Sequence, residues 1–384
     1  LIGPETKGWI RENISYAHRL GVKLEQSSNS LSRGTSTWGT DGQHQARLDG
    51  SAAVIGLGEW NVQAFSQKFW WGPGWQNSLI LSHNAPAWNG MGVQRNSVAA
   101  SSSPWWRWAG PWNFEWFVAQ AQDPWVTASQ PRGFLMSGFR LTLQPQPWLE
   151  VGLSRAMQVA GAGRPNGVKN FLDATLGQRV NQEIGDAPDS SGQIAGIDAR
   201  LRCPNAALNC AFYTQWMGED AAGKLPLPYK FMSLWGLELT DPSGRYRFFG
   251  EYNNTHANSL PWENPRFPGY TNGVYTQGYT HGTRWIGSSF GGGSEVTTLG
   301  WLDSQNERMI KLHWGSITHS AGAYAPNLSA PRGALKGLSM RQTWHWQGYR
   351  ISPEMSVLNL SQGQDQWANK RQNLRLGIEV SRRY

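Results

Sequence analysis

Two adjacent carboxylates, Glu219 and Asp220, are the clearest candidates for chemistry in this sequence. Paired carboxylates act as general acid and general base in many enzymes. Acids near the end of a strand are more often held by backbone N–H groups or by a cation, here Arg164 or Lys224. The structural role is therefore favoured, and a hydrolase or acylase activity is kept as an alternative.

Other catalytic patterns do not occur in the sequence. The eight histidines show no H-x-H or HExxH spacing, and there is no G-x-S-x-G nucleophile elbow. The glycine-rich stretch 161–167 lacks the strand-to-helix context of a dinucleotide loop. A Ser-His-Asp/Glu site assembled from separate strands is kept as an alternative, because spacing along the sequence does not test it. We predict no catalytic residue, no metal ligand and no cofactor.

Tryptophans beside glycine and proline are the most unusual feature of the chain. The segment 69–79 reads FWWGPGWQNSL, and 104–112 reads PWWRWAGPW. Both are too broken for a buried helix or a central strand. The chain has 23 Trp and 45 Gly, 39% hydrophobic residues and a mean hydropathy of −0.51. This composition favours many strands joined by turns, and so an all-β fold.

The strands that position these segments follow a period of two. In 134–143 the apolar Phe139 and Leu141 share one face, while Arg140 and Thr142 take the other. Similar alternation occurs at 149–157, 193–202, 231–239, 245–252, 296–302, 309–317, 338–346 and 374–384. Weaker strands are expected within ENISYAHRLGVKLEQ, RLDGSAAVIGLG, EWNVQAFSQKF, WWRWAG and WNFEWFVAQAQ. The expected total is even, about 16 to 18.

The connections alternate between short turns and long polar or glycine-rich loops, the long ones at 159–192, 255–294 and 319–333. This asymmetry is typical of a bacterial outer-membrane barrel, with periplasmic turns and extracellular loops. No run of about 18 apolar residues suggests a spanning helix. The terminal strand ends on the aromatic Tyr384, as strands at the end of bacterial barrels typically do. With the C-terminus in the periplasm, every short turn falls on the periplasmic side. We predict one barrel domain over residues 1–384, a monomer in contact with outer-membrane lipid and lipopolysaccharide.

The net charge of +8 points to nucleic acid, anionic lipid or an acidic polysaccharide as partner. Nucleic acid is not expected, because long basic blocks and zinc-finger or RNA-binding signatures do not occur. Inward positions carry arginines together with acids, which predicts ion pairs filling the interior. Cys203 and Cys210 suit a disulfide across a hairpin end, although two free thiols are an equal alternative. No signal peptide heads the sequence, as expected of a mature exported form or of a chain with its beginning removed.

Several blocks resemble the Wzi family of capsule assembly proteins. They are WWGPGWQNSL at 70–79, WWRWAGPW at 105–112, LEVGLSRAMQVAGAGRP at 149–165, FYTQWMGEDAAGKLP at 212–226 and YTQGYTHG at 275–282. The resemblance implies an 18-stranded outer-membrane barrel that binds capsular polysaccharide as a lectin-like anchor. Family members usually begin with a helical periplasmic segment, which has no counterpart in this sequence, and 181–191 matches no family block.

A lectin needs flat aromatic platforms flanked by amides or charged groups. The resemblance therefore directs us to loop residues as candidates for polysaccharide binding at the extracellular mouth. They are Trp71, Trp75, Gln76, Asn77, Trp88, Arg164, Glu219, Asp220, Trp262, Gln277 and Tyr279. Each tryptophan has the alternative role of joining the interfacial belt or of packing the loops. Trp148, Trp235, Trp314 and Trp344 are assigned to the belt. The leading interpretation is a non-enzymatic anchor for an acidic capsule, and a polysaccharide export channel is the main alternative.

Overall fold

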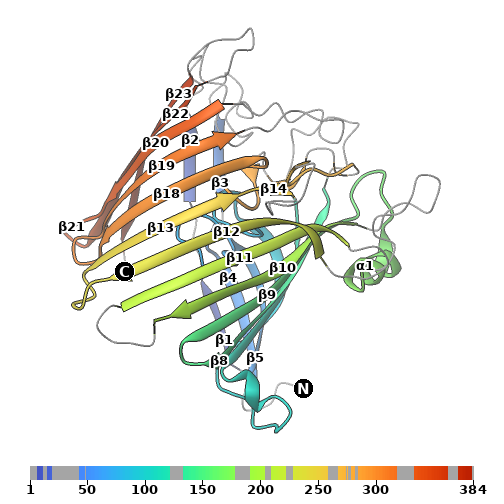
Figure 1. The fold of residues 1–384 in the computed structure, drawn as a ribbon. Coiled ribbons are helices and arrows are strands. Elements are labelled where there is room, and N and C mark those ends of the chain that lie inside the picture. The colour runs from blue at the N-terminus through green and yellow to red at the C-terminus, as the bar shows by residue number, and fades with distance from the viewer. Residues whose placement is uncertain are drawn as a thin grey trace.

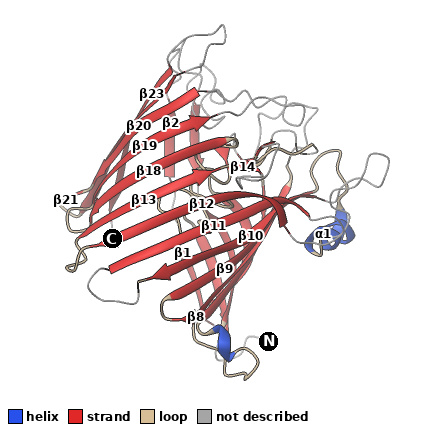
Figure 2. Ribbon diagram, viewed as in Figure 1, coloured by secondary structure: helices blue, strands red, loops and turns tan. Residues whose placement is uncertain are grey.

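We describe the protein from a computed structural model. The described residues are 7–11, 15–19, 43–47, 49–121, 133–177, 191–203, 209–221, 228–257, 267–273, 275, 278–281, 284–317, 333–361 and 371–382. Strands dominate them, and helical residues are confined to α1 (Gly167–Thr175) and the short 3-10 turn η2 (Arg107–Ala109) (Figure 2). Within this part of the chain, no helix has the length and apolar character needed to cross a membrane.

One 17-stranded antiparallel sheet forms the body of the molecule. Its strands are β1 (Lys7–Arg11), β4 (Ala52–Leu57), β5 (Trp60–Gln67), β6 (Trp88–Arg95), β7 (Trp112–Gln120), β8 (Leu135–Gln146), β9 (Leu149–Val159), β10 (Ser191–Arg202), β11 (Asn209–Ala221), β12 (Pro228–Thr240), β13 (Tyr246–Asn254), β18 (Ser294–Asp303), β19 (Arg308–Ile317), β20 (Gly333–Gln342), β21 (Trp344–Trp346), β22 (Tyr349–Ser361) and β23 (Arg371–Arg382). Three two-stranded ladders accompany them: β2 (Ser15–Arg19) with β3 (Gln43–Arg47), β14 (His256–Ala257) with β15 (Phe267–Pro268), and β16 (Thr280–His281) with β17 (Arg284–Trp285).

Each strand of the large sheet pairs with its neighbour in the chain, from β1 and β4 through to β23. Because β20 and β21 both pair with β22, the 17 strands fill sixteen positions among the described residues. The tilted strands wrap around a common interior as a barrel (Figure 1). The expected all-β barrel is confirmed, with a strand number inside the range of about 16 to 18 expected from the sequence.

The connections separate into two ends, as the sequence indicated. One end, called the short-turn end below, carries the tight connections at 58–59, 147–148, 241–245, 304–307 and 347–348. The opposite end, called the long-loop end, carries the connections that follow β5, β9 and β13. A disulfide joins Cys203 to Cys210 at the short-turn end, with Cα atoms 5.2 Å apart, so the bridged alternative holds.

The outward face of the barrel is apolar. Ile197, Leu237 and Phe248 are 44%, 47% and 52% exposed, whereas the side chains that alternate with them point into the interior. The four tryptophans assigned to the belt, Trp148, Trp235, Trp314 and Trp344, are also exposed. A continuous apolar outer surface of this kind suits contact with lipid rather than with water.

Two strand predictions need correction. WWRWAG is not a strand: it belongs to the 96–111 connection at the short-turn end, where η2 lies and Trp105 is 86% exposed. The sequence analysis also missed β6, because its WNGMGVQR sequence contains two glycines and few apolar residues. Those glycines are needed, since a Cβ on Gly90 would lie 2.3 Å from the carbonyl oxygen of Val118 on the next strand.

Met157 alternates in step with the outward-facing Leu153 on β9, yet it is fully buried. The reason is α1, which packs on β9 and contributes Ala174 to a small apolar cluster with Met157 and Val159. In Figure 1 this helix stands beside the long-loop end of the barrel. A local strand pattern contains no information about a helix that arrives later in the chain and covers one position.

Candidate functional site

The loop between β5 and β6, residues 68–87, folds into the barrel; we call it the inserted loop. Its residues Phe69, Trp71 and Leu79–Leu81 are buried in the main apolar cluster together with Phe117, Met217 and Leu234 of the barrel wall. Gly72 and Pro73 allow the sharp change of direction, since Gly72 has φ +156°. The motif therefore leaves its strand and turns back inward.

Glu251 on β13 holds the tip of the inserted loop. Its carboxylate accepts the backbone N–H groups of Trp75, Gln76 and Asn77 at 2.8, 3.2 and 3.0 Å. The Glu251 side chain is 2% exposed. Three successive N–H groups converging on one carboxylate form a concave anion site made from backbone. The loop tip is thus fixed to a barrel wall that is about 175 residues away in sequence.

Further wall residues fix the two tryptophans of the loop. The Trp71 Nε1–H donates to Glu115 at 2.8 Å, and the Trp75 Nε1–H donates to Glu238 at 2.6 Å. The Trp75 ring also stacks on Phe249, with centroids 5.8 Å apart, and Arg247 lies 4.7 Å above it. On β11, the strand next to β12, Gln215 accepts the N–H of Leu79 at 2.7 Å and donates to the Trp71 carbonyl at 2.7 Å.

The predicted inward ion pairs are present below the inserted loop. Arg140 binds Asp198 through two hydrogen bonds of 2.6 and 2.8 Å, and Arg200 binds Glu238 at 2.6 Å. Arg247 is a second cation on Glu238, at 3.2 Å. Because each of these acids faces an arginine, the interior combines charge pairing with the apolar packing of the loop. The prediction that ion-paired rungs fill the interior is confirmed for these described pairs.

A second segment, residues 267–293, closes the interior above the inserted loop; we call it the tyrosine loop. Tyr270 donates its hydroxyl to the Leu79 carbonyl at 2.8 Å, and Tyr279 donates to the Ile80 carbonyl at 2.9 Å. Tyr275 donates to Ala160 at 3.0 Å. Burial raises the pKa of all three hydroxyls, that of Tyr275 to about 12, so they remain neutral donors. The two loops are therefore bonded to each other by side chains from one and carbonyls from the other.

Four predicted binding residues are buried in this arrangement. Trp71, Asn77, Trp88 and Tyr279 are 2%, 0%, 2% and 3% exposed. Trp88 stacks on His281 with centroids 3.8 Å apart, and the Asn77 side-chain oxygen accepts the N–H of Ser289 at 2.9 Å. Their expected place at the mouth is wrong: Trp71 packs against Phe117 of the barrel wall and the other three take part in contacts of the tyrosine loop, so none of them can lie against a polymer in this conformation.

The other predicted residues have different surroundings. Trp75 and Gln76 are half-buried at the loop tip, inside the barrel rather than at its rim. Arg164 is also half-buried and lies 5.9 Å from the centroid of the Tyr275 ring. Glu219 accepts the backbone N–H of Tyr270, which agrees with the backbone-holding role favoured from the sequence. Trp262, Gln277 and the side chain of Asp220 lie outside the described residues.

The long-loop end also presents residues that the sequence analysis did not select. Phe267 is 42% exposed, and the Lys230 ammonium lies 5.8 Å from its ring centroid. Lys68 is exposed and donates to the His83 carbonyl at 3.0 Å, while Trp70 meets the His83 ring edge-on at 5.2 Å. Burial, followed by the nearby Lys68 charge, lowers the pKa of His83. Phe267 was missed because one Phe beside two prolines gives no distinctive sequence signal.

The comparisons agree with this architecture. The family model for capsule assembly protein Wzi matches residues 8–313. The solved structure of Wzi from Escherichia coli is 23% identical, with a TM-score of 0.67 over 87% of this chain and 70% of that one. It is described as an outer-membrane protein involved in group 1 capsule assembly and as a carbohydrate-binding β-barrel.

A curated relative is the uncharacterized 55.8 kDa protein in the cps region of Klebsiella pneumoniae, 33% identical over 190 residues. That match covers 49% of this chain and 36% of the relative, so it spans little more than a third of the relative's length. The family model covers most of the chain and includes both tryptophan segments and the tyrosine loop. The chain belongs to the Wzi family of capsule assembly proteins.

Proposed function

We propose that this protein is a bacterial outer-membrane anchor that binds capsular polysaccharide at its long-loop end and holds it at the cell surface. The observation that carries the proposal is the filled interior, where the inserted loop and the tyrosine loop are bonded to each other and to the wall. An anchor needs a rigid binding surface and does not need an open lumen. An export channel needs an open lumen, so this arrangement favours binding over transport.

The charges at the long-loop end support an acidic polymer as the ligand. The described cations there are Lys68, Arg164, Lys169, Lys230 and Arg284. Fewer acids have their side chains described there, among them Asp173, Glu219 and Glu295, so the cations outnumber them. The net positive charge of this end would attract a polyanion, and salt should weaken the attraction.

Phe267 and Lys230 are the described residues best suited to a sugar. The exposed ring supplies an apolar platform for the C–H face of a pyranose, and the ammonium beside it supplies a donor for a hydroxyl or a uronate. Arg164, Trp262, Gln277 and Asp220 remain predicted contacts from the surrounding loops. The related E. coli Wzi is described as carbohydrate-binding, which supports the same role in this chain.

Membrane placement and absence of catalysis belong to the same proposal. We place the long loops outside the cell and the short turns with the C-terminus in the periplasm, because exported barrels have this asymmetry. The apolar outer face would contact outer-membrane lipid and lipopolysaccharide, and the protein would act as a monomer. Glu219 serves the tyrosine loop in this scheme, so no acid–base reaction is assigned to the Glu219–Asp220 pair.

Binding of purified acidic capsular polysaccharide to the detergent-solubilised protein tests the proposal. Phe267→Ala and Lys230→Gln should each weaken binding by about threefold to tenfold, corresponding to roughly 0.6–1.4 kcal/mol. Arg202→Gln is the matched control, because it removes an exposed cation from the short-turn end. Equal losses in Lys230→Gln and Arg202→Gln would show non-specific charge attraction and refute a site at the long-loop end. In cells, deletion of the gene should release capsule into the medium.

A further inference from the structure

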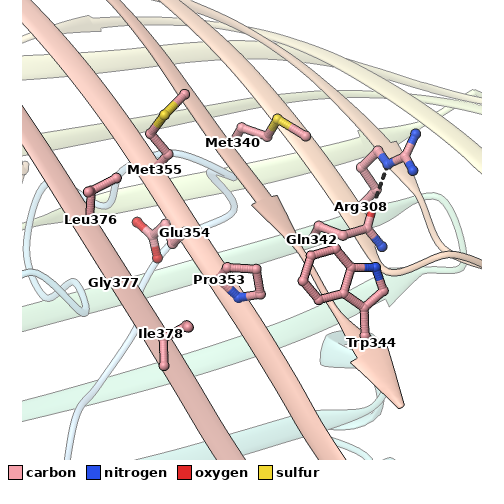
Figure 3. Close-up of a pocket in the computed structure, with 10 residues that line it drawn as sticks. All are labelled: Arg308, Met340, Gln342, Trp344, Pro353, Glu354, Met355, Leu376, Gly377 and Ile378. Atoms are coloured by element: carbon pink, nitrogen blue, oxygen red, sulfur yellow. Dashed lines mark hydrogen bonds between the residues drawn. The ribbon is translucent and has the colours of Figure 1, made fainter. Parts of the chain in front are cut away.

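A groove lies on the outward face of the barrel near the short-turn end, far from the proposed polysaccharide site. Its volume is about 630 Å³, within the range of small-molecule sites. The lining residues come from β19 to β23, and Figure 3 shows them around a central depression. They are Arg308, Met340, Gln342, Trp344, Pro353, Glu354, Met355, Leu376, Gly377 and Ile378.

A break in the strand pairing coincides with the groove. Pairing between β20 and β22 ends at Arg341 with Glu354, and pairing between β21 and β22 resumes at Trp344 with Ile351. Pro353 lies in this interval and has no N–H to donate to the ladder. The Thr343 and Ser352 hydroxyls bridge the gap at 2.9 Å instead. The regular backbone pairing with β22 is therefore interrupted beside the groove.

Most of the groove faces away from the barrel interior. Leu376 and Ile378 are 70% and 71% exposed, and they pair with Met355 and Pro353 on the adjacent strand. Met340 pairs with Met355 and is 37% exposed. Flexible methionines beside branched side chains form an apolar channel that adapts to a linear chain. The walls of the groove thus suit an acyl chain better than a sugar.

The end of the groove nearest the short turns is cationic. Arg308 is exposed and shares the outward face with its register partner Gln342, whose amide oxygen accepts the Arg308 Nε–H. Its other cross-strand neighbour, Asp303, is engaged by Arg245 at 3.3 Å and by Asn306. Among the described contacts, the Arg308 guanidinium has a neutral amide as its partner and no ion pair. Its charge is available to a ligand.

Trp344 marks the depth of the groove in the membrane. It is 57% exposed on the outward face and lies two residues from the turn that joins β21 to β22, close to exposed Trp346. Exposed tryptophans at strand ends gather where lipid headgroups meet the acyl region. Along this edge Trp344, Gln342 with its partner Arg308, and Met340 follow one another from the short turns inward, so the guanidinium lies between the level of Trp344 and the apolar channel.

We propose that this groove binds one anionic glycerophospholipid, with its phosphate on Arg308 and Gln342 and one acyl chain along Met340, Met355 and Leu376. The inference goes beyond polysaccharide binding and rests on two parts of the proposed function, the lipid contact of the outward face and the periplasmic position of the short turns. A guanidinium holds a phosphate by charge-assisted hydrogen bonds, and the Gln342 amide adds a neutral partner. With the short turns in the periplasm, the ligand would come from the inner leaflet, where phosphatidylglycerol supplies this chemistry.

Native mass spectrometry of the delipidated, intact protein titrated with phosphatidylglycerol tests the site. The wild type should retain one lipid molecule, and Arg308→Gln should lower the affinity by about tenfold or more, since a charge-assisted bond is lost. Met355→Trp should also lower it by filling the apolar channel. Lys336→Gln is the control, because Lys336 is an exposed outward cation on β20, on the long-loop side of Met340 and Gln342.

Heat-modifiable gel mobility verifies that each variant forms a folded barrel before titration. The proposal is overturned if Arg308→Gln and Met355→Trp bind phosphatidylglycerol as the wild type does, or if Lys336→Gln loses as much affinity as Arg308→Gln. A parallel titration with lipopolysaccharide separates the two lipid sources. Binding of lipopolysaccharide alone, with the same dependence on Arg308, would overturn the assignment to a phospholipid. None of these variants changes the polysaccharide site, so the two proposals fail independently.

Discussion

Removal of the Glu251 carboxylate should release the inserted loop and open the barrel. Glu251 accepts three backbone N–H groups from the loop tip, at 2.8, 3.2 and 3.0 Å, in a site that is 2% exposed. Each hydrogen bond to a charged group contributes about 1.5–3 kcal/mol. Glu251→Ala should thus shift the balance between inserted and released loop by up to about 4.5–9 kcal/mol, since the cost of burying the carboxylate is removed with the three bonds. A shift of about 5.5 kcal/mol is enough to turn a ratio of 99:1 into 1:99.

The contacts that remain after the Glu251→Ala substitution limit how much of the inserted loop is released. Glu238 still binds the Trp75 indole, and Gln215 still binds Leu79, so part of the loop population is expected to stay inside. Glu251→Gln keeps the shape and an acceptor oxygen, and should give an intermediate result. Glu150→Ala is the control, because Glu150 also alternates with outward residues on its strand and has no hydrogen bond with the inserted loop among the described contacts.

Single-channel recording in planar bilayers measures the opening. The wild type and Glu150→Ala should conduct little, whereas Glu251→Ala should show frequent long-lived openings while its barrel remains folded. Limited proteolysis within residues 68–87 should become faster in the same variant. A folded Glu251→Ala protein that conducts no more than the wild type and resists cleavage equally well would refute the reasoning, since the carboxylate would then not hold the loop.

Two further predictions concern stability. Gly236→Ala places a Cβ 2.1 Å from the ring of fully buried Tyr213, so unfolding should become easier by about 1–3 kcal/mol. Thermal unfolding of the solubilised protein measures this, with Gly377→Ala as the control because a Cβ there meets nothing within 4 Å; equal midpoints for the two variants would contradict the packing argument. In the 304–307 turn, a hydrogen bond from His345 and then one from Arg350 lower the pKa of Glu307 from 4.5 to about 2. The folded-state pKa is below the unfolded one, so the stabilisation is present above pH 4.5 and is lost as the pH falls towards 2. Glu307→Gln should therefore lower the unfolding temperature at pH 7 but not near pH 2. The corresponding loss in the free energy of unfolding should be less than about 1 kcal/mol, because the group is partly exposed. A difference that does not change with pH would show that the carboxylate charge is not responsible.

The sequence was informative wherever one face of a strand meets lipid. Ile197, Leu237 and Phe248 alternate with polar residues because the lipid excludes polar side chains, and this period of two identifies an outward face without any knowledge of its neighbours. The strands from β8 onward could be predicted for that reason. β6 could not be predicted in this way, because its glycines are required by the close approach of β7 and not by contact with lipid.

The tryptophan motif illustrates what the sequence left undecided. The Gly-Pro-Gly sequence predicts a bend, but the direction of the bend depends on partner residues on distant strands. Trp71 and Trp75 point inward because Glu115 and Glu238 accept their indole N–H groups, across 44 and 163 residues. Glu251 could be placed on the inward face from its parity, yet its role as the holder of three backbone N–H groups requires the folded loop.

The sequence by itself therefore determined the class of the protein: an all-β barrel with an apolar outer face, alternating short and long connections, inward ion pairs and the motif blocks of its family. Tertiary structure decided which aromatic residues remain available to a ligand. It buried Trp71, Trp88 and Tyr279 inside the barrel, and left Phe267 exposed beside Lys230. The physical reason is that strand periodicity is set locally by the contrast between lipid and interior, whereas a loop side chain is placed by hydrogen bonds to residues that only the closed barrel brings near.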